Sequence, residues 1–161
     1  MLTLKTTALF ATLSTMIAFL TFTNVQADDD MTAEKPAHYT IPVGIHGYSP
    51  VSYFEDGPEA GSPAFPVVHD GVTYFLTDAA QVEKFEADPE TYLPAYGGWC
   101  AFGMAVEDHF AIDPTNFKIV DGRLMLFLKN ADVDALELWN QQGDDDATAK
   151  ADAFWNQTHG H

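Results

Sequence analysis

Two stretches of the chain place β-branched, aromatic and polar residues on either side of an Asp-Gly pair. In residues 67–76 the pair is Asp70-Gly71, and in residues 117–127 it is Asp121-Gly122. Asp-Gly favours a two-residue hairpin turn because both residues tolerate a positive φ. The pattern therefore predicts two antiparallel β-hairpins.

Apolar residues at helical spacing follow the first hairpin. Val82 and Phe85 share one face of a predicted helix that Asp78 is expected to cap, with Gln81 three residues further on. Pro89 cannot continue that helix but suits the first position of a new turn. We therefore expect one helix and one short helical turn here.

A second helical region is predicted after the second hairpin. Asn130 is expected to cap a helix over residues 131–142, whose apolar residues, Trp139 among them, lie roughly at helical spacing. Gly143 and the three aspartates after it are expected to break that helix. The alanine-rich stretch at residues 147–157 suits one more helix.

The residues before the first hairpin contain many turn formers. Residues 44–54 are interpreted as a loop that leads into a short strand, and residues 55–66 as a loop. The predicted fold class is therefore α+β, with small antiparallel β-hairpins packed against short helices. It forms a single domain over residues 44–157, with a C-terminal tail at residues 158–161.

The first 27 residues have the composition of a secretory signal peptide. Lys5 precedes an apolar and hydroxyl-rich run over residues 8–22, and small residues surround Ala27. The run is shorter than the ~20 apolar residues that a membrane span needs. We expect cleavage after Ala27, a flexible leader over residues 28–43, and a periplasmic or secreted protein with no membrane span.

The charge of the chain narrows its expected partners. It contains 24 acidic and 7 basic residues, and its formal net charge is −17. This balance argues against nucleic acid, because phosphate binding requires clustered lysine and arginine. The sequence also lacks the motifs of hydrolases, zinc proteases and phosphate-binding loops. We therefore expect binding rather than catalysis, with a metal ion or a periplasmic protein as the partner.

The only cysteine, Cys100, lies in the stretch YGGWCAFGMAVEDH at residues 96–109. A single cysteine cannot form an intrachain disulfide. An unpaired thiol in an oxidising compartment is exposed to oxidation unless it is buried, bound to a metal or used in chemistry. The function of this segment therefore depends on the surroundings of its thiol.

The chain resembles exported YHS-domain proteins over most of residues 44–157. The residues that carry the resemblance are Gly47-Tyr48, Pro50-Val51, Tyr53-Phe54, Tyr74-Phe75, Phe85, Asp88-Pro89, Tyr92, Tyr96-Gly97-Gly98-Trp99-Cys100-Ala101, Val120-Asp121-Gly122, Leu124, Trp139, Lys150-Ala151-Asp152-Ala153 and Trp155. The broader YHS group is similar to metal-binding modules, in which cysteines after the Pro-Val turn and after the Tyr-Phe strand are the implied ligands.

This chain departs from the metal-binding YHS pattern. It has Ser52 or Tyr53 after the Pro-Val pair, and Leu76 and Ala79 or Ala80 after the Tyr-Phe pair, where the resemblance would place cysteines. The cysteine-rich site is therefore missing. What remains is similar to the exported single-cysteine subgroup, whose cysteine matches Cys100.

The relation between Cys100 and Met104 depends on local structure. In a strand the two residues would lie ~13 Å apart, whereas in a helix their Cβ atoms would lie ~5–6 Å apart, close enough to share one ion. The segment has no β-branched residue before Val106, which predicts a short helix that begins near Gly98 and is weakened by Gly103. The first turn of a helix also favours the thiolate form of a cysteine.

Thiolate and thioether sulfur together suit Cu(I). The first hypothesis is therefore a copper site formed by Cys100 and Met104, with His109 as a third ligand. Further candidate ligands are His46 and the two terminal histidines, His159 and His161.

Two alternatives remain open. In the first alternative, Cys100 is a single reactive thiol that forms a sulfenic acid or a mixed disulfide with a partner. It is a buried structural residue of a non-catalytic interaction module in the other. The sequence favours a core position for Met104 and a surface position for His109 over a ligand role.

Overall fold

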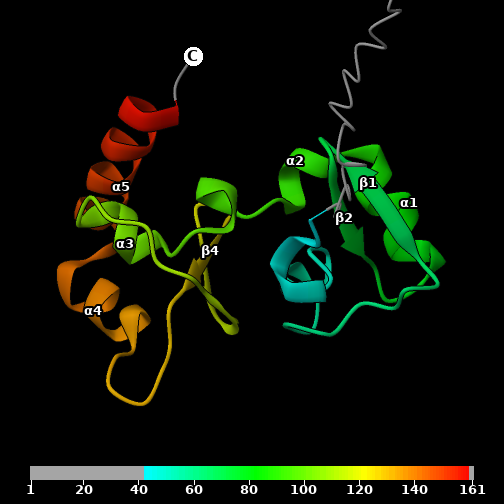
Figure 1. The fold of residues 1–161 in the computed structure, drawn as a ribbon, viewed down its shortest axis with the longest axis horizontal. Coiled ribbons are helices and arrows are strands. Elements are labelled where there is room, and N and C mark those ends of the chain that lie inside the picture. The colour runs from blue at the N-terminus through cyan, green and yellow to red at the C-terminus, as the bar shows by residue number, and fades with distance from the viewer. Residues whose placement is uncertain (1–41, 160–161) are drawn as a thin grey trace, which may run out of the picture. The chain divides into compact units, whose positions relative to one another are not determined.

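The structure, a computed structural model, describes residues 42–159 (Figure 1). The predicted signal peptide at residues 1–27, and the predicted leader as far as residue 41, lie outside these residues, as do residues 160 and 161. The predicted α+β fold class is confirmed, because short helices and two antiparallel hairpins share one hydrophobic core.

The two predicted hairpins are present. Their strands are β1 (Pro66–His69) with β2 (Val72–Phe75), and β3 (Asp113–Val120) with β4 (Arg123–Phe127). Asp70 and Gly71 have φ values of 47° and 76°, and Asp121 and Gly122 have values of 50° and 77°. Two consecutive positive φ values are what a type I′ turn requires. The Asp-Gly pairs thus set the register of both hairpins.

The helices are short, apart from the last one. They are η1 (Gly44–Gly47), η2 (Ser52–Phe54), α1 (Ala79–Ala87), α2 (Pro89–Tyr92), η3 (Ala95–Gly98), α3 (Ala101–Ala105), α4 (Ala135–Gln142) and α5 (Asp144–His159), where η denotes a 3₁₀ turn. Figure 1 shows β1 and β2 beside α1, and β4 beside the helices α3, α4 and α5.

The predictions for α1 and α2 are confirmed. Asp78 caps α1, and its Oδ1 accepts the N–H of Gln81 at 2.9 Å. Pro89 is the first residue of α2, where its missing N–H costs no helical hydrogen bond.

The predicted start of α4 is wrong by four residues. The helix begins at Ala135, and its N-cap is Asp134, whose Oδ1 accepts the N–H of Leu136 at 3.1 Å. Asn130 instead accepts two backbone N–H groups of the preceding loop. Asparagine and aspartate side chains close turns as readily as they cap helices, so the sequence alone placed the cap one turn too early.

Helix α5 is longer than predicted at both ends. It begins at Asp144, in the aspartate run that was expected to interrupt the helices, because acidic side chains stabilise the positive end of the helix dipole. It ends at His159, so the first two residues of the predicted tail are helical.

Residues 44–54 form two 3₁₀ turns, and the predicted short strand is absent from them. The Ser52 hydroxyl donates to the Ser49 carbonyl at 2.8 Å and accepts the N–H of Glu59 at 3.0 Å. These local hydrogen bonds compete with strand formation. Tyr53 then reaches across to β3, where its ring packs on Phe117 and its hydroxyl donates to the Pro114 carbonyl at 2.7 Å.

Within residues 42–159, no helix combines the length and the apolar composition that crossing a bilayer requires.

Candidate functional site

Cys100 and Met104 lie one helical turn apart. The N–H of Met104 donates to the Cys100 carbonyl at 3.1 Å, and Cys100 is the N-cap of α3. The expected helix is therefore present, but it begins at Ala101 rather than near Gly98. Gly97 and Gly98 have positive φ values of 59° and 86° and form the end of a separate turn.

Both sulfur atoms belong to the core. Cys100 and Met104 have no exposed surface. The Cys100 Sγ accepts a hydrogen bond from the N–H of Leu128 at 3.3 Å, directly after strand β4. This arrangement suits the structural interpretation of the cysteine, since a metal ion or an oxidant would reach either sulfur only if the core opened.

The other two predicted ligands lie at the surface. His46 is exposed on η1, and His109 is exposed in the loop after α3. The described part of the chain contains no group of three or more histidine, cysteine, aspartate or glutamate side chains arranged to hold a metal ion. The structure thus places the two sulfur atoms in the core and the two imidazoles at the surface.

The loop after α3 fixes the position of His109. The N–H of Cys100 donates to the carbonyl of Phe110 at 3.1 Å, which brings the two preceding residues, Trp99 and His109, side by side. Gly103 permits this return of the loop, because a Cβ there would lie 2.9 Å from the Asp108 carbonyl oxygen. The glycine that weakens the helix is thus required by the loop.

Small residues bring α3 against α5. Ala101 of α3 and Ala147 and Ala151 of α5 have no exposed surface. Alanine side chains allow two helices to approach closely. This packing carries the loop that holds His109 over the last turns of α5.

A group of ring side chains results, which we call the aromatic–imidazole cluster. Its members are Tyr96, Trp99, His109, Phe154, Trp155 and His159. The ring centre of His109 lies 5.2 Å from that of Trp99, 5.6 Å from that of Phe154 and 5.7 Å from that of His159. The cluster therefore brings together two imidazoles that are 50 residues apart in the chain.

Neighbouring groups orient His159 within the cluster. Its ring stacks on Trp155, four residues earlier in α5, with centres 3.8 Å apart and planes 14° apart. Its Nδ1 lies 2.7 Å from the Thr158 hydroxyl, and the two form a hydrogen bond. With Nδ1 engaged, Nε2 is the ring atom left for another ligand.

A hydrogen-bonded anchor around the buried Tyr96 holds the inner side of the cluster. The Tyr96 ring packs on Trp155, and its hydroxyl donates to Asp152 at 2.8 Å. Asp152 also accepts two hydrogen bonds from Arg123, at 2.9 and 3.0 Å. Burial, followed by the hydrogen bond to Asp152, raises the pKa of Tyr96 well above its ordinary value, so the phenol stays neutral.

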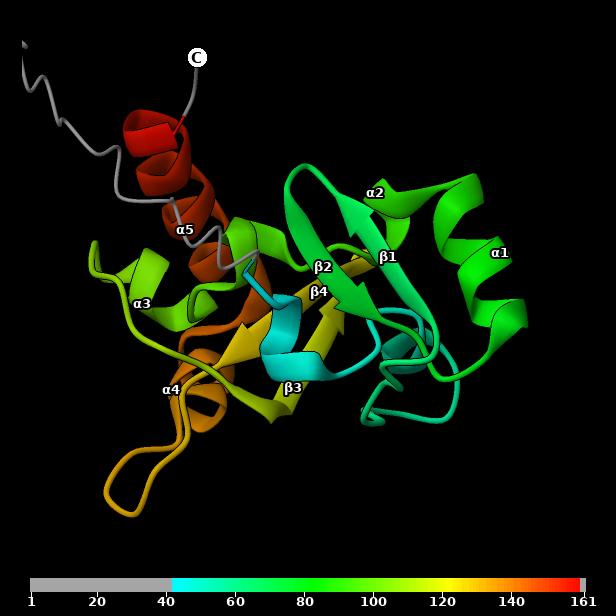
Figure 2. The same ribbon diagram turned by 45° about the vertical axis from the view of Figure 1, so that its right-hand side comes forward.

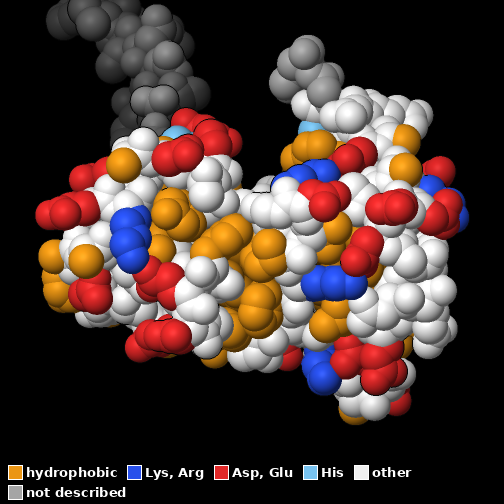
Figure 3. Space-filling view, turned by 180° about the vertical axis from the view of Figure 1, so that it is seen from behind, with side chains coloured by type: hydrophobic (Ala, Val, Ile, Leu, Met, Phe, Trp, Pro, Cys, Tyr) orange, Lys and Arg blue, Asp and Glu red, His pale blue; other side chains and the backbone are white. Residues whose placement is uncertain are grey.

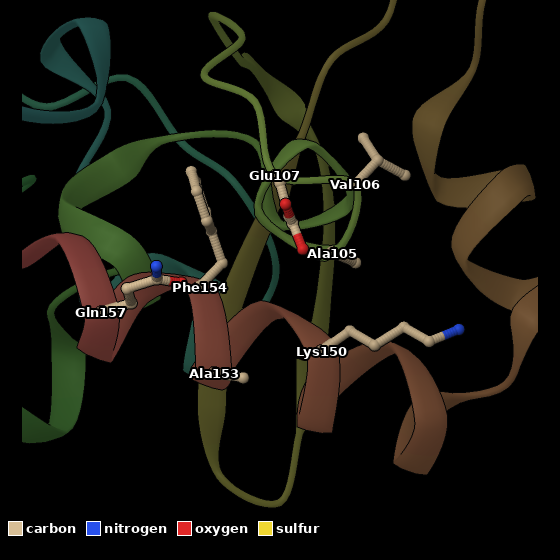
Figure 4. Close-up of a pocket in the computed structure, with 7 residues that line it drawn as sticks. All are labelled: Ala105, Val106, Glu107, Lys150, Ala153, Phe154 and Gln157. Atoms are coloured by element: carbon tan, nitrogen blue, oxygen red, sulfur yellow. The ribbon is translucent and has the colours of Figure 1, made fainter.

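An open groove of about 420 Å³ borders the cluster and shares Phe154 with it (Figure 4). Ala105, Ala153 and Phe154 contribute apolar surface. Glu107 points from the loop after α3 toward α5, which carries Lys150. The cluster is therefore open to solvent on this side.

The chain is acidic overall, with 24 acidic and 7 basic residues. Figure 3 shows one face, on which acidic side chains outnumber lysines and arginines and lie around a hydrophobic central area. The negative net charge attracts cations.

Comparisons with protein-family models, with curated proteins and with solved structures found no match to this chain.

His109 and His159 were both candidate ligands from the sequence, and His159 was expected in the C-terminal tail rather than in a helix. The four-residue spacing of Trp155 and His159 was the signal for a helical stack. The contact between His109 and His159 had no comparable local signal.

Proposed function

We propose that this chain is an exported YHS-type domain protein that binds copper at the aromatic–imidazole cluster, through His109 and His159. The observation that carries the proposal is the separation of 5.7 Å between the two imidazole centres. A metal–nitrogen bond is ~2.0–2.1 Å long, so two imidazoles that share one ion have ring centres ~5–6 Å apart.

The donor atoms favour copper over harder cations. Imidazole nitrogen suits copper, zinc and nickel, and among these divalent ions Cu²⁺ generally binds most tightly. The hydrogen bond between the Nδ1 of His159 and Thr158 resembles the outer contacts that orient histidine ligands. The acidic surface raises the local concentration of cations.

Two imidazoles leave further coordination positions for water or for a partner's ligands. Such an open site suits uptake and release of the ion, that is, metal handling rather than storage in a closed cage. In this proposal Cys100 supports the site from the core, since its backbone N–H donates to the Phe110 carbonyl and holds the segment of Trp99 against that of His109.

The test is a Cu²⁺ titration of the purified protein, followed by tryptophan fluorescence and electron paramagnetic resonance. Trp99 and Trp155 lie in the cluster, so bound copper should quench their emission. We expect His109→Ala and His159→Ala each to weaken binding ~10-fold or more. His69→Ala, in strand β1, is the matched control and should bind as the wild type does.

A Cys100→Ala variant separates this site from a sulfur site. It should keep its Cu²⁺ affinity and show nitrogen hyperfine splitting from imidazole. Loss of binding in Cys100→Ala with wild-type binding in both histidine variants would show that copper binds sulfur, and would overturn the proposal.

A further inference from the structure

A second pocket, of about 280 Å³, lies between the turns η1 and η3. Its walls include His46 of η1, Gly97 and Gly98 of η3, and the rings of Tyr74 and Trp99. Figure 2 shows η1, the cyan turn, next to strand β2, which carries Tyr74. The pocket shares Trp99 with the aromatic–imidazole cluster but contains neither His109 nor His159.

Strained backbone is concentrated at this pocket. Within residues 42–159, six residues other than glycine have a positive φ. Asp70 and Asp121 have a positive φ because they lie in the hairpin turns. Three others lie in η1 and η3, namely Ile45, His46 and Tyr96. A β-branched residue such as Ile45 almost never adopts a φ of 49°. Strain of this kind persists only where the surroundings enforce it, and it gathers at binding sites.

The strained turns determine which rings face the pocket. One backbone hydrogen bond closes each turn. The Tyr48 N–H donates to the Ile45 carbonyl in the first, and the Trp99 N–H donates to the Tyr96 carbonyl in the second, both at 3.0 Å. Both turns contribute lining residues, namely His46 from the first and Trp99 directly after the second. Trp99 remains 41% exposed, which is high for a tryptophan in a folded domain.

Close contacts prevent η1 from relaxing into a roomier shape. A Cβ at Gly44 would lie 2.2 Å from the Tyr74 ring, so the turn presses directly on that side chain. The bare backbone of Gly97 and Gly98 lines the same pocket. The pocket thus combines ring faces with side-chain-free backbone, and both permit close approach by a flat molecule.

The chemistry of the lining restricts the ligand. None of the residues that line the pocket is an aspartate, glutamate, lysine or arginine. The polar side chains are His46 and Tyr74. Burial, with smaller contributions from Asp70 and Glu90, raises the pKa of Tyr74, so its hydroxyl remains protonated. The volume is just below the usual range of small-molecule pockets, which suits one or two rings.

We infer that this pocket binds a small, neutral, planar molecule, which packs against Trp99 and exchanges a hydrogen bond with His46. The inference does not depend on copper, because the pocket lacks both proposed copper ligands. A ligand here would nevertheless touch the indole that also contacts His109. Binding at one site should therefore be detectable at the other.

The test uses the full chain, free of metal, with indole as the probe and amide chemical shifts as the measurement. We expect saturable shifts at His46, Gly97 and Gly98. Cyclohexanol is not planar and benzoate is charged. Each should bind at least ~10-fold more weakly than indole. The absence of saturable shifts with indole, or equal shifts with cyclohexanol, would overturn the inference.

Variants at the two rings provide a second test. Trp99→Leu should weaken indole binding ~5-fold or more, because stacking is lost. His46→Gly removes an exposed side chain from a left-handed position, so it should raise the melting temperature while weakening indole binding. Val68→Ala, at an exposed position of β1 outside the pocket, is the control for both.

The two variants also separate a ligand site from a merely structural turn. A structural turn would give a more stable His46→Gly protein with unchanged indole affinity, and that result would refute the inference. Loss of indole binding with intact copper binding in His46→Gly, a position outside the aromatic–imidazole cluster, would support the pocket independently of the proposed function.

Discussion

The thiol of Cys100 has no exposed surface and accepts the N–H of Leu128. We predict that Cys100→Ala lowers the free energy of unfolding by ~1–3 kcal/mol, because it leaves a cavity and removes the acceptor of a buried N–H group. Urea unfolding of the two proteins measures this difference. Ser62→Ala, which alters a hydrogen bond at the surface, is the control and should change stability much less.

The same burial predicts the reactivity of the thiol. A chromogenic disulfide reagent should label native Cys100 at least ~10³-fold more slowly than the unfolded chain, with a rate that rises with urea as the protein opens. Rapid labelling under native conditions would instead favour the single-reactive-thiol hypothesis.

Single residues also mark the limit of prediction from the sequence. Asp70-Gly71 and Asp121-Gly122 located both hairpins, because their φ preferences are local. The left-handed φ of Ile45 was not predictable, because a β-branched residue favours extended backbone and only its tertiary surroundings override that preference. The pairing of His109 with His159 likewise depends on helix packing rather than on spacing.

Among the secondary-structure elements, α1 and α4 show when a cap is recognisable. Asp78 begins α1 as predicted, with Gln81 in the expected position. Near α4 the sequence offers Asn130, Asp132 and Asp134 within five residues, and each has the right chemistry. Asp134 is selected by contacts from other elements, since Asn116 of β3 also donates to its Oδ1, at 3.0 Å.

We therefore predict that Asp134→Ala lowers the melting temperature by ~3–6 °C, because α4 loses its N-cap and Asn116 loses a partner. Asp134→Asn keeps an acceptor at the cap and should lose less than half as much. Calorimetry on both variants checks this expectation. Equal losses would show that the charge of Asp134, rather than its capping oxygen, stabilises the helix.

For the whole molecule, acid has two opposing effects. The net charge of −17 means that protonation relieves repulsion among the acidic side chains. Against this, Asp152 joins α5 to β4 and η3 through Arg123 and Tyr96. Burial opposes ionisation of Asp152, but the hydrogen bonds from Arg123 and Tyr96 outweigh it and hold the pKa of this carboxyl below its ordinary value.

A pKa lowered in the folded state contributes stability at pH values above the unfolded-state pKa of ~3.9, and that stability is lost as the pH falls through the folded-state pKa. The stability difference between wild type and Asp152→Asn should therefore be full near pH 6 and shrink below about pH 4. Urea unfolding over this range measures it. Asp56→Asn, at an exposed turn position outside the helices, removes a similar charge and reports the repulsion without a helix-dipole contribution. The stability difference between this control variant and wild type could follow the same pH dependence. General repulsion, rather than the contact of Asp152 with Arg123 and Tyr96, would then govern the acid response. The anchor beneath the aromatic–imidazole cluster would in that case be weaker than its geometry indicates.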